Sequence, residues 1–104
     1  MITVYVSIGN SDDRLSQLDW SGFFSFVDRA ISAAGDYNGT TIHGRWASLP
    51  HEPWQNACWC LEIDEVALAD VVGVLRAELA DAARFYRQES VAWAEAKTEF
   101  IGAS

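Results

Sequence analysis

Hydrophobic and polar residues alternate one by one at the start of the chain. Apolar side chains fill every second position from residue 2 to residue 8, namely Ile2, Val4, Val6 and Ile8. A period of two residues is typical of a β-strand with one buried face, because successive side chains of a strand point to opposite sides. We therefore predict a strand here, with Tyr5 on its other face.

Two later segments show the three- and four-residue spacing of amphipathic helices. The first places aromatic and aliphatic residues on one stripe from Trp20 to Ala34, and Gly35 follows it. The second runs from Leu68 to Tyr86, and Asp64 is placed to cap its first turn. Both segments are predicted to be helices that cover a sheet.

Alternation returns in residues 40–49, which predicts a second strand. We expect Ile42 and Trp46 to face the core, and His43 and Arg45 to face the opposite side. A third strand is predicted for residues 57–63 on the same grounds.

Both cysteines lie in this third predicted strand. Trp59 stands between Cys58 and Cys60, so we expect Trp59 in the core and the two thiols on the opposite face. Same-face neighbours in a strand lie about 6.5 to 7 Å apart, too far for an unstrained disulfide. His43 and His51 are further zinc-ligand types, but the spacing lacks the paired Cys-x-x-Cys of zinc sites. We predict free thiols and neither a metal nor a cofactor.

A last strand is predicted from Val91 to Ile101. Its small residues alternate with larger ones, in the order Ala92, Trp93, Ala94, Glu95, Ala96 and Lys97. Inward-facing alanines allow helices to pack closely and avoid burying charged groups. We therefore expect the alanines to face the helices and Trp93 to lie on the opposite face.

The predicted order is strand, helix, strand, strand, helix, strand. This is the α+β, ferredoxin-like βαββαβ pattern, and we predict a single domain over residues 1–104. Its four-stranded antiparallel sheet has the spatial order 4-1-3-2, with both helices on one face. The second face, which we name the open face, has no helix over it.

The chain is acidic. Fifteen Asp and Glu against seven Lys and Arg give a net charge of -8, which repels phosphate backbones. Direct nucleic-acid binding is therefore not expected, although an acidic protein can instead imitate nucleic acid and occupy its binding partner. No apolar run reaches the roughly 18 residues of a membrane span, and no basic leader opens the sequence, so we expect a cytoplasmic protein without membrane contact.

The open face collects the side chains with the most chemistry. Neighbouring strands lie about 4.8 Å apart, so a phenol, an imidazole, a guanidinium and two thiols come close together there. Trp54, in the loop of residues 50–54, is an aromatic anchor of the kind that interfaces enrich. The candidate ligand or interface residues are Tyr5, His43, Arg45, Trp54, Cys58, Cys60 and Trp93.

Three stretches of the chain resemble a group of small α+β proteins of actinobacteria and the phages that infect them. They are IGNSDDRLSQ, HGRWASLPHEPWQNACWC and QESVAWAEAKTEF. The resemblance spans most of the chain. It implies an accessory or phage-associated role and no particular activity.

Three functions are open at this point. We favour a non-catalytic module that forms a homodimer or binds a protein partner through the open face and the loop Pro50 to Trp54. The first alternative is a small ligand-binding protein or enzyme that uses the His, Tyr, Arg and Cys cluster. The second is an acidic inhibitor that imitates nucleic acid. Catalysis is less favoured, because no Gly-rich turn or helix N-terminus points at the middle of the sheet to stabilise an oxyanion.

Overall fold

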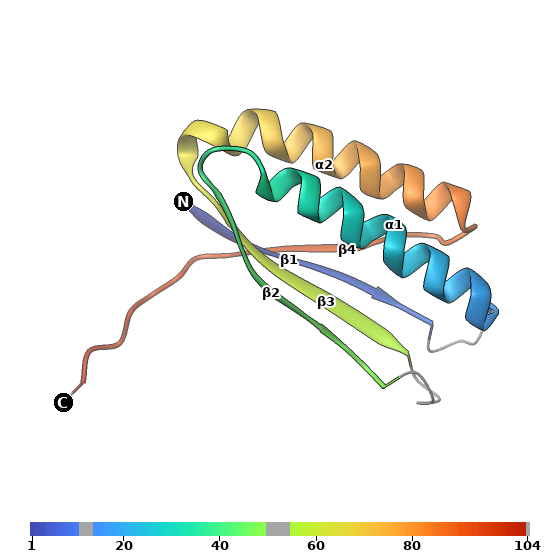
Figure 1. The fold of residues 1–104 in the computed structure, drawn as a ribbon. Helices are drawn as coiled ribbons and strands as arrows, with labels where there is room; N and C mark the ends of the chain where they lie inside the picture. The colour runs from blue at the N-terminus through green and yellow to red at the C-terminus, as the bar shows by residue number, and fades with distance from the viewer. Residues whose placement is uncertain (11–13, 50–54, 104) are drawn as a thin grey trace.

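A computed structural model describes residues 1–10, 14–49 and 55–103 of the chain. Its elements follow the predicted order of strands and helices. Their bounds are β1 Ile2–Gly9, α1 Gln17–Gly35, β2 Thr40–Ala47, β3 Asn56–Ile63, α2 Glu65–Phe85 and β4 Ala92–Ala96. The last strand is shorter than predicted: strand pairing ends at Ala96, the Thr98 hydroxyl still contacts that of Thr3 at 2.8 Å, and the chain then extends away from the body (Figure 1).

The strands form one antiparallel sheet in the order β2-β3-β1-β4. Both helices lie over the same face of this sheet (Figure 1). The arrangement is α+β with the ferredoxin-like βαββαβ topology, so the predicted fold class and the predicted spatial order 4-1-3-2 are confirmed. The open face has neither helix over it.

The hydrophobic core lies between the helices and the inward face of the central strands. Val4 and Val6 of β1 are completely buried, as are Leu61 and Ile63 of β3. The helices cover them with Phe23, Val27, Ile31, Val71, Leu75 and Leu79. Burying each of these side chains contributes roughly 1.5–3 kcal/mol, and this is what holds the two layers together.

The two helices start at capping side chains. The Ser16 hydroxyl accepts a hydrogen bond from the backbone N–H of Asp19 at 3.1 Å, and the Asp64 carboxylate accepts one from that of Ala67 at 3.0 Å. Each cap contributes about 1 kcal/mol. Within the described residues, neither helix combines the length and the apolar character that crossing a membrane requires.

A buried amide network joins the end of β1 to the residues around it. Asn10 is 1% exposed; its side chain donates to the Leu15 carbonyl at 3.0 Å and to Gln55 Oε1 at 3.1 Å, and accepts from the Leu15 N–H at 3.0 Å. The Gln55 amide in turn exchanges hydrogen bonds with Gln17 at the start of α1. Because its polar groups are satisfied within the fold, Asn10 has a structural role.

β2 contains a β-bulge. Ile42 pairs with Leu61 and Gly44 pairs with Cys60, so His43 is one extra residue between two consecutive partners. Gly44 has a φ of +153°, which residues with a side chain rarely adopt. The glycine lets the strand absorb the extra residue.

The bulge exchanges the faces to which the side chains point in the second half of β2. Arg45 pairs with Trp59, which faces the helices, whereas Trp46 pairs with Cys58 and is 60% exposed on the open face. The expectations for Arg45 and Trp46 are therefore wrong. Side chains of a strand alternate with a period of two, so one inserted residue exchanges the two faces.

Arg45 consequently contacts α1. Its guanidinium lies 2.6 Å from the Asp28 carboxylate and 5.4 Å from the centre of the Phe24 ring, and the Trp59 indole N–H donates to Asp28 at 2.9 Å. Burial by itself raises the pKa of Asp28, but the hydrogen bonds from Arg45 and Trp59 and the Arg45 charge outweigh it, so this pKa lies below the usual 3.8. Asp28 thereby ties α1 to both β2 and β3.

β4 also faces the opposite way from the expectation. Trp93 pairs with Val6 of the core, and cross-strand partners share a face, so Trp93 faces the helices and the alanines lie on the open face. Arg76 of α2 lies over the Trp93 ring, 5.3 Å from its centre. The half-buried tryptophan supplies more apolar contact than alanine, and Glu95, on the same side, stays exposed at the sheet edge, which avoids the cost of burying its charge.

Asp28→Asn should lower the free energy of unfolding by about 1 kcal/mol near neutral pH, because Arg45 loses its charged partner while Trp59 keeps an acceptor. The pKa of Asp28 is lower in the folded state than in the unfolded state. The charged carboxylate therefore stabilises the fold fully when the pH is above the pKa of the unfolded state. That contribution is lost as the pH falls through the folded pKa. Urea unfolding at several pH values measures the difference, which should vanish in acid. The control Asp70→Asn, on an exposed position of α2, should show no such difference.

Gly44→Ala should destabilise the protein by roughly 1 kcal/mol, because the added side chain strains the backbone at φ +153°. No atom lies within 4 Å of the added carbon, so the cost comes from the backbone alone. Gly73→Ala in α2 is the matched control, since its added carbon is equally free of contacts, and it should stabilise by about 1 kcal/mol. Equal effects of the two substitutions in thermal unfolding would show that the bulge carries no strain.

Candidate functional site on the open face

The open face brings four of the predicted site residues together. Tyr5 of β1 pairs with Cys60 of β3, Cys58 lies two residues along the same strand, and His43 approaches from β2. The face is formed by the side chains of Thr3, Tyr5, Ser7, Thr41, His43, Trp46, Asn56, Cys58, Cys60, Glu62, Ala92, Ala94 and Ala96. Both cysteines are free thiols, as predicted.

Two predicted site residues are not on this face, and a third is not among the described residues. Arg45 and Trp93 lie on the helix side of the sheet, for the reasons given above. Trp54 and the loop of residues 50–54, together with His51, lie outside the described residues. The cluster of phenol, imidazole, guanidinium and thiols that the sequence predicts therefore lacks its guanidinium.

Trp46 is the open-face residue that the sequence interpretation missed. It is the most exposed aromatic side chain on this face and lies beside Cys58. The sequence feature that could have revealed the orientation of Trp46 is Gly44, because a glycine inside a strand pattern often marks a bulge. A bulge at that point predicts that Trp46 turns outward.

Tyr5 stands at the centre of the face and is 41% exposed. The neighbouring Cys60 raises the pKa of Tyr5, by its charge when ionised and by side-chain hydrogen bonding, and slight burial and Cys58 add to the effect. Tyr5 is therefore a neutral phenol at physiological pH. It can donate and accept hydrogen bonds, but it is not suited to remove a proton from a substrate.

His43 and Glu62 form a polar pair on this face. His43 Nε2 lies 3.6 Å from Glu62 Oε1, and both side chains are partly open to solvent. Among residues 1–10, 14–49 and 55–103, no three His, Cys, Asp or Glu side chains lie close enough together to hold a metal ion. The pair therefore provides a polar contact at the rim of a mostly uncharged surface.

The lack of charge distinguishes the open face from the rest of the chain. Of the fifteen acidic residues, Glu62 is the one that belongs to the open-face positions of the described strands. Tyr5, Trp46, the two thiols and three alanines make up most of the remainder. What this arrangement offers chemically is apolar contact with a few hydrogen-bonding groups.

The sequence matches no family model and no curated protein. Among solved structures, it is similar to one described as "The crystal structure of AtUAH in complex with glyoxylate", with 11% identity and a TM-score of 0.48 over 92% of this chain, which spans 26% of that one. It is also similar to a phage SAM lyase in the apo state, with 15% identity and a TM-score of 0.45 over 97% of this chain and 92% of that one. Likenesses this distant carry no argument about activity.

Cys60→Ala should lower the pKa of Tyr5 toward its usual value of 10, because Cys60 is the main cause of the upward shift. Cys58→Ala is the matched control and should lower this pKa less, since Cys58 contributes least. An NMR titration of the Tyr5 ring signals, assigned with Tyr5→Phe, measures both. Equal shifts in the two variants would contradict the pairing of Tyr5 with Cys60.

Proposed function

We propose that the protein is a non-catalytic interaction module that pairs with a second copy of itself through the open face. The observation that carries the proposal is the near absence of charge on this face of a chain with a net charge of -8. Two acidic proteins repel one another when their charged surfaces meet. A neutral face is the surface through which two copies can approach with least repulsion.

The exposed aromatic residues support the same proposal. Trp46, on the edge strand β2, and Tyr5, on the central strand β1, have exposed fractions of 60% and 41%. Exposed aromatic side chains on a neutral patch are typical of the residues that contribute most to protein interfaces. The polar pair of His43 and Glu62 would lie at the rim, where charged groups cost little.

The size of the face limits the strength of such a pair. Four strands about 4.8 Å apart and five to eight residues long cover roughly 400 Å² in projection, whereas a stable interface buries about 800 Å² on each partner. Phe100 and Ile101, beyond β4, are 87% and 95% exposed on a segment that leaves the body (Figure 1). We include these two side chains in the proposed interface, because they provide the apolar area that the sheet lacks.

The alternatives have less support. A catalytic or ligand-binding cluster of His, Tyr, Arg and Cys requires Arg45 beside the thiols, and Arg45 contacts Asp28 on the other side of the sheet. An imitation of nucleic acid through the open face would require rows of carboxylates there, and this face carries one in the described strands. The free thiols are in keeping with a reducing compartment such as the cytoplasm, and the resemblance to small actinobacterial and phage proteins is in keeping with an accessory role.

Sedimentation of the purified chain at about 100 μM should show a dimer, and Trp46→Glu should raise its dissociation constant at least about tenfold by placing a charge in the interface. Leu18→Glu is the matched control, because Leu18 is 83% exposed on α1, far in the fold from the open face, and it should leave the dimer unchanged. Phe100→Ser combined with Ile101→Ser should weaken the dimer as well. A wild-type chain that stays monomeric, or equal effects of Trp46→Glu and Leu18→Glu, would refute the proposal.

A further inference from the structure

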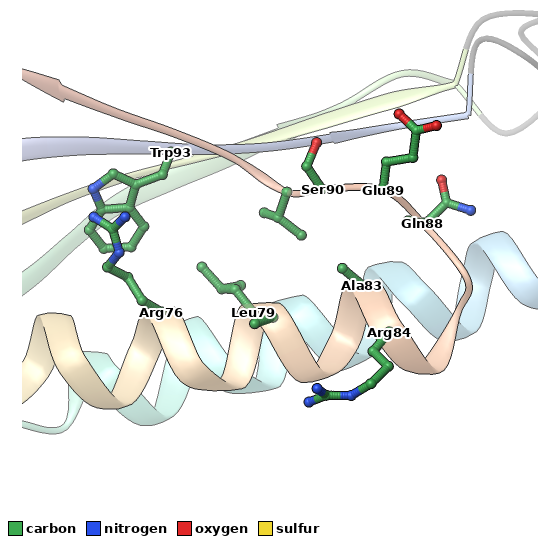
Figure 2. Close-up of a pocket in the computed structure, with 10 residues that line it drawn as sticks. Arg76, Leu79, Ala83, Arg84, Gln88, Glu89, Ser90 and Trp93 are labelled. Carbon is green, nitrogen blue, oxygen red and sulfur yellow. The ribbon is translucent and has the colours of Figure 1, made fainter.

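A cavity lies between α2 and β4, on the helix side of the sheet and away from the open face. It has a volume of about 470 Å³, which is in the range of small-molecule sites. Leu79 and Ala83 of α2 and Val91, just before β4, give it an apolar lining. Figure 2 shows Trp93 with Arg76 stacked against it at one end, and Gln88, Glu89 and Ser90 toward the other.

A second, polar cavity is lined by the same residues that follow α2. It has a volume of about 240 Å³ and shares Gln88, Glu89 and Ser90 with the first cavity. Arg14, which follows β1, and Arg87, which follows α2, complete its lining. We call the two cavities together the α2–β4 cleft. Its larger part combines apolar side chains with Arg76 and Arg84, and its smaller part is polar and is lined by Arg14 and Arg87.

The cleft concentrates the positive charge of an acidic chain. Four of the seven Lys and Arg residues line it, whereas Glu89 is the one acidic residue among its described lining residues. The four are Arg14, Arg76, Arg84 and Arg87. This distribution is opposite to that of the whole chain, which has a net charge of -8.

Helix stabilisation explains only part of this distribution. Arg84 is in the last turn of α2, where a cation offsets the helix dipole, and it pairs with Asp81. Arg76 lies nine residues before the end of α2, or roughly 13 Å along the axis, and Arg14 comes from another segment. Neither of these two is placed to act on the helix terminus.

Arg87 has an unusual backbone conformation. Its φ is +56°, and it is the non-glycine residue with positive φ among the described residues. Glycine or asparagine is the usual choice for this position after a helix, and other residues cost of order 1 kcal/mol there. This position places Arg87 in the lining of the smaller cavity.

We propose that the α2–β4 cleft binds a small organic phosphate. The apolar or planar body of the ligand occupies the larger cavity, against Leu79, Val91 and the stacked Arg76 and Trp93. Its phosphate lies in the smaller cavity, which Arg14 and Arg87 line. Phosphate is favoured because a guanidinium binds it with two parallel hydrogen bonds, and because a dianion suits a cavity lined by two arginines. This inference is independent of the proposed pairing through the open face.

Binding to the full chain can be followed by NMR through the indole N–H of Trp93, assigned with Trp93→Phe. The probes are AMP, hexyl phosphate, adenosine and inorganic phosphate, each up to about 10 mM, where even weak affinities register. AMP or hexyl phosphate should shift the signal in a saturable way. Tighter binding of AMP would indicate a ligand with a planar body, and tighter binding of hexyl phosphate one with an aliphatic body. No saturable shift with either, or equal affinity for adenosine or for inorganic phosphate, would overturn the proposal.

Three substitutions test the two parts of the cleft. Arg87→Asn introduces a residue that tolerates positive φ. It should lower the affinity for the organic phosphate about tenfold, because it removes a charge-assisted hydrogen-bonded pair. Ala80→Leu, at an exposed lining position of α2, fills the larger part and should weaken the organic phosphate without changing the response to inorganic phosphate. Lys97→Gln removes an equal charge outside the cleft and should change the affinity less than about twofold. Equal losses in Arg87→Asn and Lys97→Gln would mean that only net charge matters and would refute the site.

Discussion

One extra residue in β2 determines what each face of the sheet presents. His43 has no partner of its own in β3, and Gly44 supplies the backbone conformation that accommodates the bulge. Beyond it, Arg45 turns toward α1 and Trp46 turns toward the open face. Arg45 thereby pairs with Asp28 on the helix side of the sheet, and Trp46 is exposed on the open face.

On the helix side of the sheet, the bulge leads to a group of polar contacts in a mostly apolar layer. The Asp28 carboxylate accepts from both Arg45 and Trp59, so a helix, an edge strand and a central strand meet at one side chain. A charge that is partly removed from water is tolerated only when it is paired and hydrogen-bonded, and all of its partners are in place here. The hydrogen bonds from Arg45 and Trp59 and the charge of Arg45 lower the pKa of Asp28.

Charge is distributed unevenly over the molecule, and two surfaces differ in their charge. The open face is nearly neutral and carries exposed aromatic residues, which suits contact between macromolecules. The α2–β4 cleft is small, hollow and cationic, which suits a small anion. They lie on opposite sides of the sheet, so occupation of one leaves the other accessible.

Much of the fold was predictable because its signals are local. The alternation in β1 and the helical spacing of α1 and α2 depend on neighbouring residues, and they predict element types and the βαββαβ order correctly. Capping by Ser16 and Asp64 is equally local. The end of β4 was not predictable, because whether a segment pairs in a sheet depends on a neighbour that is distant in sequence.

The candidate site was predictable where alternation is unbroken, and His43, at the bulge, also lies on the open face as expected. Tyr5, Cys58 and Cys60 lie on the open face as expected, because nothing interrupts β1 or β3. The orientation of Trp46 depends on a bulge, and that of Trp93 on a choice between two faces of similar polarity.

The sequence by itself thus determined the elements, their order and the inner residues of the central strands, because burying apolar side chains at a fixed period leaves one solution. Only the tertiary structure decided the faces of the edge strands and the gathering of arginines between α2 and β4. The physical reason is that edge strands are half solvated, so either orientation buries little, and the choice rests on partners such as Asp28 and Arg76 from elsewhere in the chain.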